Sequence, residues 1–254
     1  TFQSAPSLSN SSSLSVSNGE LVLQNGGTVN GSSVQLSASK FKPTGTVSVT
    51  NGGSLNFNEL SSVVLQGDTT LTQSSPANWS NLDLNGNKLT LNVSEMKCCK
   101  DQAGGLTIKN GEAITAFASS DITVQNKLTI ANGGKLSSGT GNTTIQEALT
   151  LNGEIEQGGG ILNLTQGGTV GATGKLDVSD SELKLGAALN VSGTLAANSA
   201  SQWSGWSGTL DLTAGTLEAA GGSISLSQFS TGAGTTLKLS ADTEITSASD
   251  YTFG

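Results

Sequence analysis

Short runs in which apolar and polar side chains alternate recur along the whole chain. Most are apolar–polar–apolar triplets bounded by Gly or Asn, such as Leu82-Asp83-Leu84, Leu106-Thr107-Ile108, Leu149-Thr150-Leu151 and Leu210-Asp211-Leu212. Alternation with a period of two residues is typical of β-strands that bury one face. We find no comparable repeat with a helical period, so the pattern predicts an all-β protein with almost no helix.

Turn residues separate these runs. Asn-Gly pairs occur at 18–19, 51–52, 85–86, 110–111, 132–133 and 152–153, and both residues tolerate the positive φ angle of a sharp corner. Two architectures use such a sequence: a barrel of hairpins with Asn-Gly turns, and a solenoid whose coils each carry several short strands. The runs are short, and selected triplets recur about every 20–27 residues, which favours a parallel β-solenoid. A coil of about 21 residues predicts roughly twelve coils.

A solenoid would stabilise strands that cannot fold alone. A three-residue strand pairs its backbone and buries its side chains only when it stacks on similar strands in the coils above and below. In this arrangement we expect Leu128, Ile130, Leu149 and Leu151 to face inward and to stack with neighbouring coils.

Two segments depart from the alternating pattern. Residues 1–13 are rich in Ser and Asn, and we expect them to form a loose lead-in or cap, with residues 14–254 making a single β-helix. Residues 94–105 hold both cysteines, the single Met and two lysines. We interpret 94–105 as a loop that protrudes from one coil, because its charged residues prefer water, and we expect the protein to tolerate its deletion.

The composition argues against several classes of function. The chain has no His and all eleven basic residues are Lys, so the usual side chains for acid–base catalysis and for bidentate phosphate recognition are missing. The formal net charge of −8 and the pI near 4.4 argue against a nucleic-acid partner, which would require a basic surface. No run reaches the ~18 apolar residues of a membrane helix. The N-terminus shows no signal-peptide pattern, and we expect any export signal or anchor to lie outside this chain.

Two segments illustrate a resemblance to a known family: Ser-Val-Ser-Asn-Gly-Glu-Leu-Val-Leu at 15–23 and Leu-Asp-Val-Ser-Asp-Ser-Glu-Leu-Lys-Leu at 176–185. They resemble the β-helical passenger domains of bacterial autotransporters, a group that includes adhesins and vacuolating-cytotoxin-like surface proteins. The resemblance covers nearly the whole chain and lies in its overall pattern, not in a single motif. It implies a right-handed parallel β-helix, export, and an extracellular or bacterial cell-surface location. It also implies a host-cell surface or extracellular matrix partner, or self-association, with membrane attachment only through regions outside this chain.

Three tryptophans and two cysteines are candidate site residues. Trp79, Trp203 and Trp206 are candidate binding residues, because exposed aromatic side chains stack on sugars and on partner side chains. The alternative is that they cap the core at an irregular turn. Adjacent Cys98 and Cys99 are candidates for a disulfide, with each other or with cysteines outside this chain, and free thiols are the alternative. We expect no metal site, since His is absent and Cys scarce, and no cofactor.

Acidic residues leave one further hypothesis open, a carbohydrate-active β-helix enzyme, which would need clustered Asp or Glu side chains. Glu154 and Glu156 would share one strand face about 7 Å apart, and Asp177, Asp180 and Glu182 form the next closest group. The competing interpretation is that all are solvated surface charges and that no residue is catalytic. The leading hypothesis is therefore a non-catalytic, secreted or surface-displayed rod that presents loops to a partner. A purely structural stalk or phage-fibre segment is the other alternative.

Overall fold

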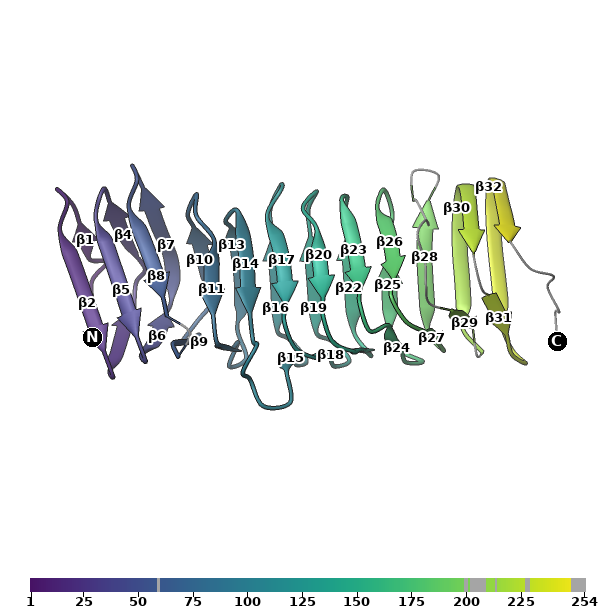
Figure 1. The fold of residues 1–254 in the computed structure, drawn as a ribbon, viewed down its shortest axis with the longest axis horizontal. Helices are drawn as coiled ribbons and strands as arrows, with labels where there is room; N and C mark the ends of the chain where they lie inside the picture. The colour runs from purple at the N-terminus through teal and green to yellow at the C-terminus, as the bar shows by residue number, and fades with distance from the viewer. Residues whose placement is uncertain (59, 199–200, 202–208, 213, 227–228, 248–254) are drawn as a thin grey trace.

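The computed structural model describes residues 1–58, 60–198, 201, 209–212, 214–226 and 229–247. All of its regular elements are β-strands, stacked along one axis from the N-terminal to the C-terminal end (Figure 1). The described residues contain no helix, and hence no helix that could cross a membrane. The predicted all-β parallel solenoid is confirmed.

The strands line up as three walls. The first wall is a single twelve-stranded parallel sheet, which we call the long sheet. Its strands are β1 (Ser7–Leu8), β4 (Gly27–Asn30), β7 (Gly45–Thr50), β10 (Thr69–Thr72), β13 (Lys88–Asn92), β16 (Ala113–Ala116), β19 (Lys135–Ser138), β22 (Glu154–Gln157), β25 (Lys175–Asp177), β28 (Thr194–Asn198), β30 (Thr216–Leu226) and β32 (Thr236–Ser247).

The second wall consists of two sheets. The first contains β2 (Ser13–Ser17), β5 (Ser33–Ser37) and β8 (Ser54–Phe57). The next contains β11 (Ala77–Trp79), β14 (Glu95–Cys98), β17 (Asp121–Val124), β20 (Thr143–Ile145), β23 (Ile161–Leu164) and β26 (Glu182–Leu185).

The third wall is divided in the same way. Its first sheet contains β3 (Glu20–Leu23), β6 (Lys40–Pro43), β9 (Ser62–Val64) and β12 (Asn81–Asp83). Its second sheet contains β15 (Leu106–Ile108), β18 (Leu128–Ile130), β21 (Leu149–Leu151), β24 (Gly168–Val170), β27 (Leu189–Val191), β29 (Leu210–Leu212) and β31 (Phe229–Thr231).

Successive strands visit the three walls in turn, so each coil contributes one strand to each wall. The described residues make about ten coils, slightly fewer than the twelve that a constant 21-residue repeat predicts. The coils are unequal in length. Leu136 pairs with Ile155, nineteen positions further on, whereas Leu89 pairs with Ile114, twenty-five positions further on.

The core is a set of aliphatic stacks that run along the axis between the walls. In the third wall Leu128 pairs with Leu149, and Ile130 pairs with Leu151. All four side chains are essentially inaccessible to solvent, as the alternation predicted. A strand inside the stack therefore buries apolar area against two neighbouring coils as well as within its own coil.

Residues 1–13 take a larger part in the solenoid than a loose lead-in would. Ser7–Leu8 forms β1, the outermost strand of the long sheet, in register with Thr28 and Val29. Phe2 forms a further bridge with Leu23, and Leu8 packs against the core. The first coil therefore begins before residue 14. Phe2 and Leu8 gain burial when their backbone pairs with the open end of the stack.

The predicted loop at 94–105 is wrong over its first half. Glu95–Cys98 forms β14, which pairs in register with β11 and β17. Met96, Cys98 and Cys99 are fully buried. Met96 and Cys98 alternate with charged neighbours, so the segment fits the strand pattern despite its charge. The chain leaves the wall only between β14 and β15, and this shorter turn protrudes below the stack (Figure 1).

Leu149→Asp tests the assignment of the inner face. Leu149 is 1% exposed, so the substitution buries an unpaired charge and should lower the free energy of unfolding by on the order of 4 kcal/mol. Thr150→Asp is the matched control, because Thr150 is the outward, exposed residue of the same strand. Urea unfolding should separate the two variants clearly. Equal stability of Leu149→Asp and the parent would mean that the inner face is wrongly assigned.

Replacement of residues 95–103 by a Gly-Ser linker should abolish cooperative unfolding, because it removes a buried strand that pairs on both edges. The control is Lys100→Ser combined with Asp101→Ser, which changes only exposed residues of the protruding turn and should leave the melting temperature nearly unchanged. Circular dichroism during heating measures both. A linker variant that melts like the parent would contradict the burial of β14.

Candidate functional site

The second wall has an opening between β8 and β11. No strand pairing joins these two strands within the described residues, although β7 pairs with β10 in the long sheet and β9 pairs with β12 in the third wall. The sequence before β11 accounts for the break. Pro76 has no N–H to donate to a ladder, and the Gln73 side chain donates hydrogen bonds to the carbonyls of Ser75 and Pro76 at 3.1 and 2.8 Å.

Aromatic side chains line the core at this opening. The ring centroids of Phe41 and Phe57 are 5.7 Å apart, and those of Phe57 and Trp79 are 5.9 Å apart in an edge-on arrangement. Trp79 is only 4% exposed. The side chain points inward from β11, which agrees with the alternative that Trp79 caps the core. Trp203 and Trp206 lie outside the described residues.

An open pocket of about 410 Å³ lies at the opening, a volume typical of small-molecule sites. We call it the wall pocket. Its lining combines two aromatic rings with amide, hydroxyl and charged side chains. The lining residues are Phe57, Asn58, Asn78, Trp79, Ser80, Lys97, Lys100, Asp101 and Gln125. Four segments of the second wall and its turns supply them, so only the folded stack brings them together.

Both cysteines adjoin Trp79, one of the residues that line this site. Cys98 is the register partner of Trp79, and the Cys99 N–H donates to the Trp79 carbonyl at 3.1 Å. Cys98 and Cys99 form a vicinal disulfide with both residues fully buried. The sequence left open a disulfide between the two cysteines, a disulfide to a cysteine outside this chain, and free thiols. The structure contains the first of these. Cys99 has a φ of 77°, so the turn toward Lys100 and Asp101 begins at the disulfide.

Gln102 holds the protruding turn against the third wall. Its side-chain oxygen accepts from the Leu82 N–H at 3.0 Å, and its Nε2 donates to the Leu82 carbonyl at 3.2 Å. The Gln102 side-chain amide thus makes the two hydrogen bonds at the edge of β12 that the backbone of a neighbouring strand would otherwise make. Asn126 donates to the Gln102 carbonyl at 3.0 Å from the next coil. These contacts fix the turn, and with it Lys100 and Asp101 at the pocket rim.

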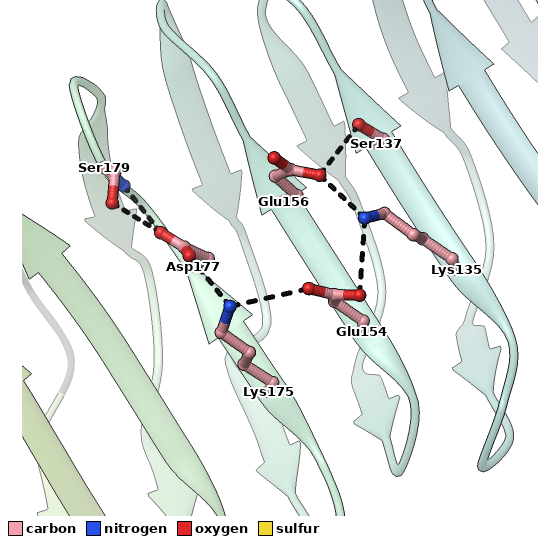
Figure 2. Close-up of polar contacts among 7 residues, drawn as sticks. All are labelled: Lys135, Ser137, Glu154, Glu156, Lys175, Asp177 and Ser179. Carbon is pink, nitrogen blue, oxygen red and sulfur yellow. Dashed lines mark hydrogen bonds and ion pairs between the residues drawn. The ribbon is translucent and has the colours of Figure 1, made fainter.

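A charged network lies on the outer face of the long sheet (Figure 2), and none of its residues lines the wall pocket. It joins Lys135 and Ser137 of β19, Glu154 and Glu156 of β22, Lys175 and Asp177 of β25, and Ser179. Lys135 Nζ lies 3.3 Å from a Glu154 oxygen and 2.8 Å from a Glu156 oxygen. Lys175 Nζ lies 3.5 Å from Glu154 and 3.1 Å from Asp177. Charges of both signs therefore alternate across three coils.

The network favours the ionised forms of Glu156 and Asp177. The hydrogen bond from Lys135 lowers the pKa of Glu156 and raises the pKa of Lys135. Burial opposes ionisation of Asp177, but hydrogen bonds from Ser179 and Lys175 outweigh it and lower the pKa of Asp177. The bond to Asp177 likewise raises the pKa of Lys175. A glycosidase acid needs a raised pKa, so neither Glu156 nor Asp177 is suited to donate a proton at neutral pH.

The acidic group predicted around residues 177–182 does not converge on one point. Asp177 belongs to the long sheet and Glu182 to β26 of the second wall, where Glu182 lies 3.5 Å from Lys184. Asp180 accepts from the Asn198 amide at 2.9 Å in the turn between them. Across the described ranges, no three His, Cys, Asp or Glu side chains gather to hold a metal ion.

Comparisons of the chain with protein-family models, with curated proteins and with solved structures gave no match.

Lys135→Met should raise the pKa of Glu156 toward its usual value of 4.5 and lower stability by about 0.5–1 kcal/mol, as expected for half-exposed ion pairs. A carboxylate with a lowered folded pKa adds stability above its unfolded pKa and loses it as pH falls through the folded pKa. The loss of stability in Lys135→Met should therefore be present at pH 7. It should vanish once the pH falls below the folded-state pKa of Glu156 and this carboxylate is protonated. Carboxylate NMR and urea unfolding across pH measure both effects.

Lys127→Met is the control for this experiment, because Lys127 is exposed and has no ion pair with described residues. It should leave the pKa of Glu156 unchanged. A stability deficit of Lys135→Met that persisted at acid pH would contradict an electrostatic role for the network and point to lost packing of the lysine stem.

Proposed function

We propose that this chain is a non-catalytic rod from a secreted or surface-displayed bacterial protein, similar in role to an autotransporter passenger domain. In this proposal the solenoid carries a binding surface that contacts a host-cell surface or an extracellular matrix component. The long sheet is the observation that supports it most strongly. Its twelve strands continue through the stack, and such a ladder gives a scaffold that holds protruding segments in fixed positions.

The distribution of irregular features also favours a presenting scaffold. In nine successive coils, from β1 to β27, each coil repeats the same three strands. The wall opening and the protruding turn between β14 and β15 adjoin one another, on the same side of the same coils. A surface that departs from the repeat at one place is what recognition of a partner requires, whereas a purely structural stalk needs no such departure.

The ionised network supports a soluble surface rather than a catalytic centre. Its carboxylates are neutralised by Lys135 and Lys175, and the lowered pKa of Glu156 and of Asp177 fits solvated structural ion pairs. The net charge of −8 favours solubility and repulsion between rods at high local concentration.

Binding to cells and matrix tests this function. The folded chain should bind saturably to at least one member of a panel of immobilised collagen, fibronectin, laminin and cultured epithelial cells. Thr150→Asp is the folded control and should bind equally, and Leu149→Asp is the unfolded control and should lose binding. Absence of saturable binding to every member would contradict the proposal and favour a stalk. Cleavage of a polysaccharide by the chain would contradict it in favour of an enzyme.

A further inference from the structure

Among the described residues, three buried side-chain atoms lack a hydrogen-bond partner: Gln73 Oε1, Trp79 Nε1 and Thr143 Oγ1. The first two belong to the segment that borders the wall opening. A buried donor without a partner costs about 1–3 kcal/mol, and such groups are rare in folded proteins. Trp79 borders the wall pocket, and its indole N–H is a buried donor that lacks a partner beside the site.

The pocket walls carry further unused groups. Asn78 and Gln125 line the pocket, and neither side chain hydrogen bonds to any described residue. Each carboxamide offers two donors and two acceptor positions. In contrast, the Asn58 side chain at the same pocket already has partners, since it donates to Ser37 and accepts from the Ala38 N–H. Asn78 and Gln125 are therefore the amides available to a ligand.

The charges of the lining residues favour an anionic ligand. Lys97 is half-buried beside Asn78 on the next strand, and Lys100 lies at the exposed start of the turn. Neither lysine has an ion pair with a described carboxylate, and together they outnumber Asp101 in the described lining. Five of the other nine lysines are neutralised by ion pairs, namely Lys42, Lys135, Lys175, Lys184 and Lys238.

We propose that the wall pocket binds an acidic saccharide, a sugar chain that carries carboxylates. Amides that both donate and accept match sugar hydroxyls, and the edges of Phe57 and Trp79 give an apolar floor for a sugar ring. The ammonium groups of Lys97 and Lys100 bind the carboxylate. This inference rests on the proposed function, because it names the partner chemistry of the presented surface.

The second wall offers a matched control for the pocket. Asn78 pairs in register with Lys97, and further along the same wall Asn163 pairs in register with Lys184. Asn163 and Lys184 lie outside the pocket lining. The double variants Asn78→Ala/Lys97→Met and Asn163→Ala/Lys184→Met therefore make the same chemical change on the same wall, inside and outside the site.

Titration calorimetry with oligogalacturonate and hyaluronan oligosaccharides, and with neutral cello-oligosaccharides, tests the site on the whole chain. At least one acidic probe should bind better than the neutral probe. The pocket double variant should lose about tenfold or more in affinity, and the outside double variant should stay within about twofold of the parent. Thermal melting of both variants checks that they fold.

No binding of either acidic probe, equal loss in both double variants, or equal binding of the neutral probe would overturn the inference. If the pocket double variant still binds cells or matrix like the parent, the proposed function stands and the saccharide site is excluded as its basis.

Discussion

Backbone hydrogen bonding between successive coils is the constraint on which this structure depends. Strands of three or four residues, such as Leu149–Leu151, cannot bury their side chains or satisfy their backbone alone. Such a strand is stabilised by parallel neighbours that pair with its edges, as Leu128–Ile130 and Gly168–Val170 pair with both edges of Leu149–Leu151. Alternate side chains must then point inward at every level, which forces the aliphatic stacks, and outward, which forces rows of polar residues.

The same constraint explains where chemistry can arise. On an unbroken wall, outward side chains from adjacent coils lie about 4.8 Å apart and satisfy each other, as Lys135, Glu154 and Lys175 do. Where a wall loses its pairing, between β8 and β11, inward rings and unused amides become neighbours of solvent. The buried Cys98–Cys99 disulfide and the Gln102 side chain hold this place together without a regular ladder.

Local pattern was enough to predict the fold, but not the site. Inward Leu149 and outward Thr150 follow from alternation within one strand, and the stacking of such strands follows from their shortness. Paired residues of successive coils are nineteen to twenty-six positions apart, and no local signal in the sequence specifies which residues pair. The partnership of Trp79 with Cys98 could not be predicted for that reason. The strand Glu95–Cys98 was missed although Met96 and Cys98 alternate correctly, because its charges and adjacent cysteines resemble a loop.

Distances between spin labels on the long sheet test the stacked-coil account most directly. Lys88, Thr194 and Thr236 occupy one outward row, with Thr194 five pairings and Thr236 seven pairings beyond Lys88. Labels attached to cysteines at 88 and 194 should be about 24 Å apart, and at 88 and 236 about 34 Å apart. This increase of about 10 Å for two added coils is the predicted result. Distances that fail to grow with the number of coils would contradict the parallel stack.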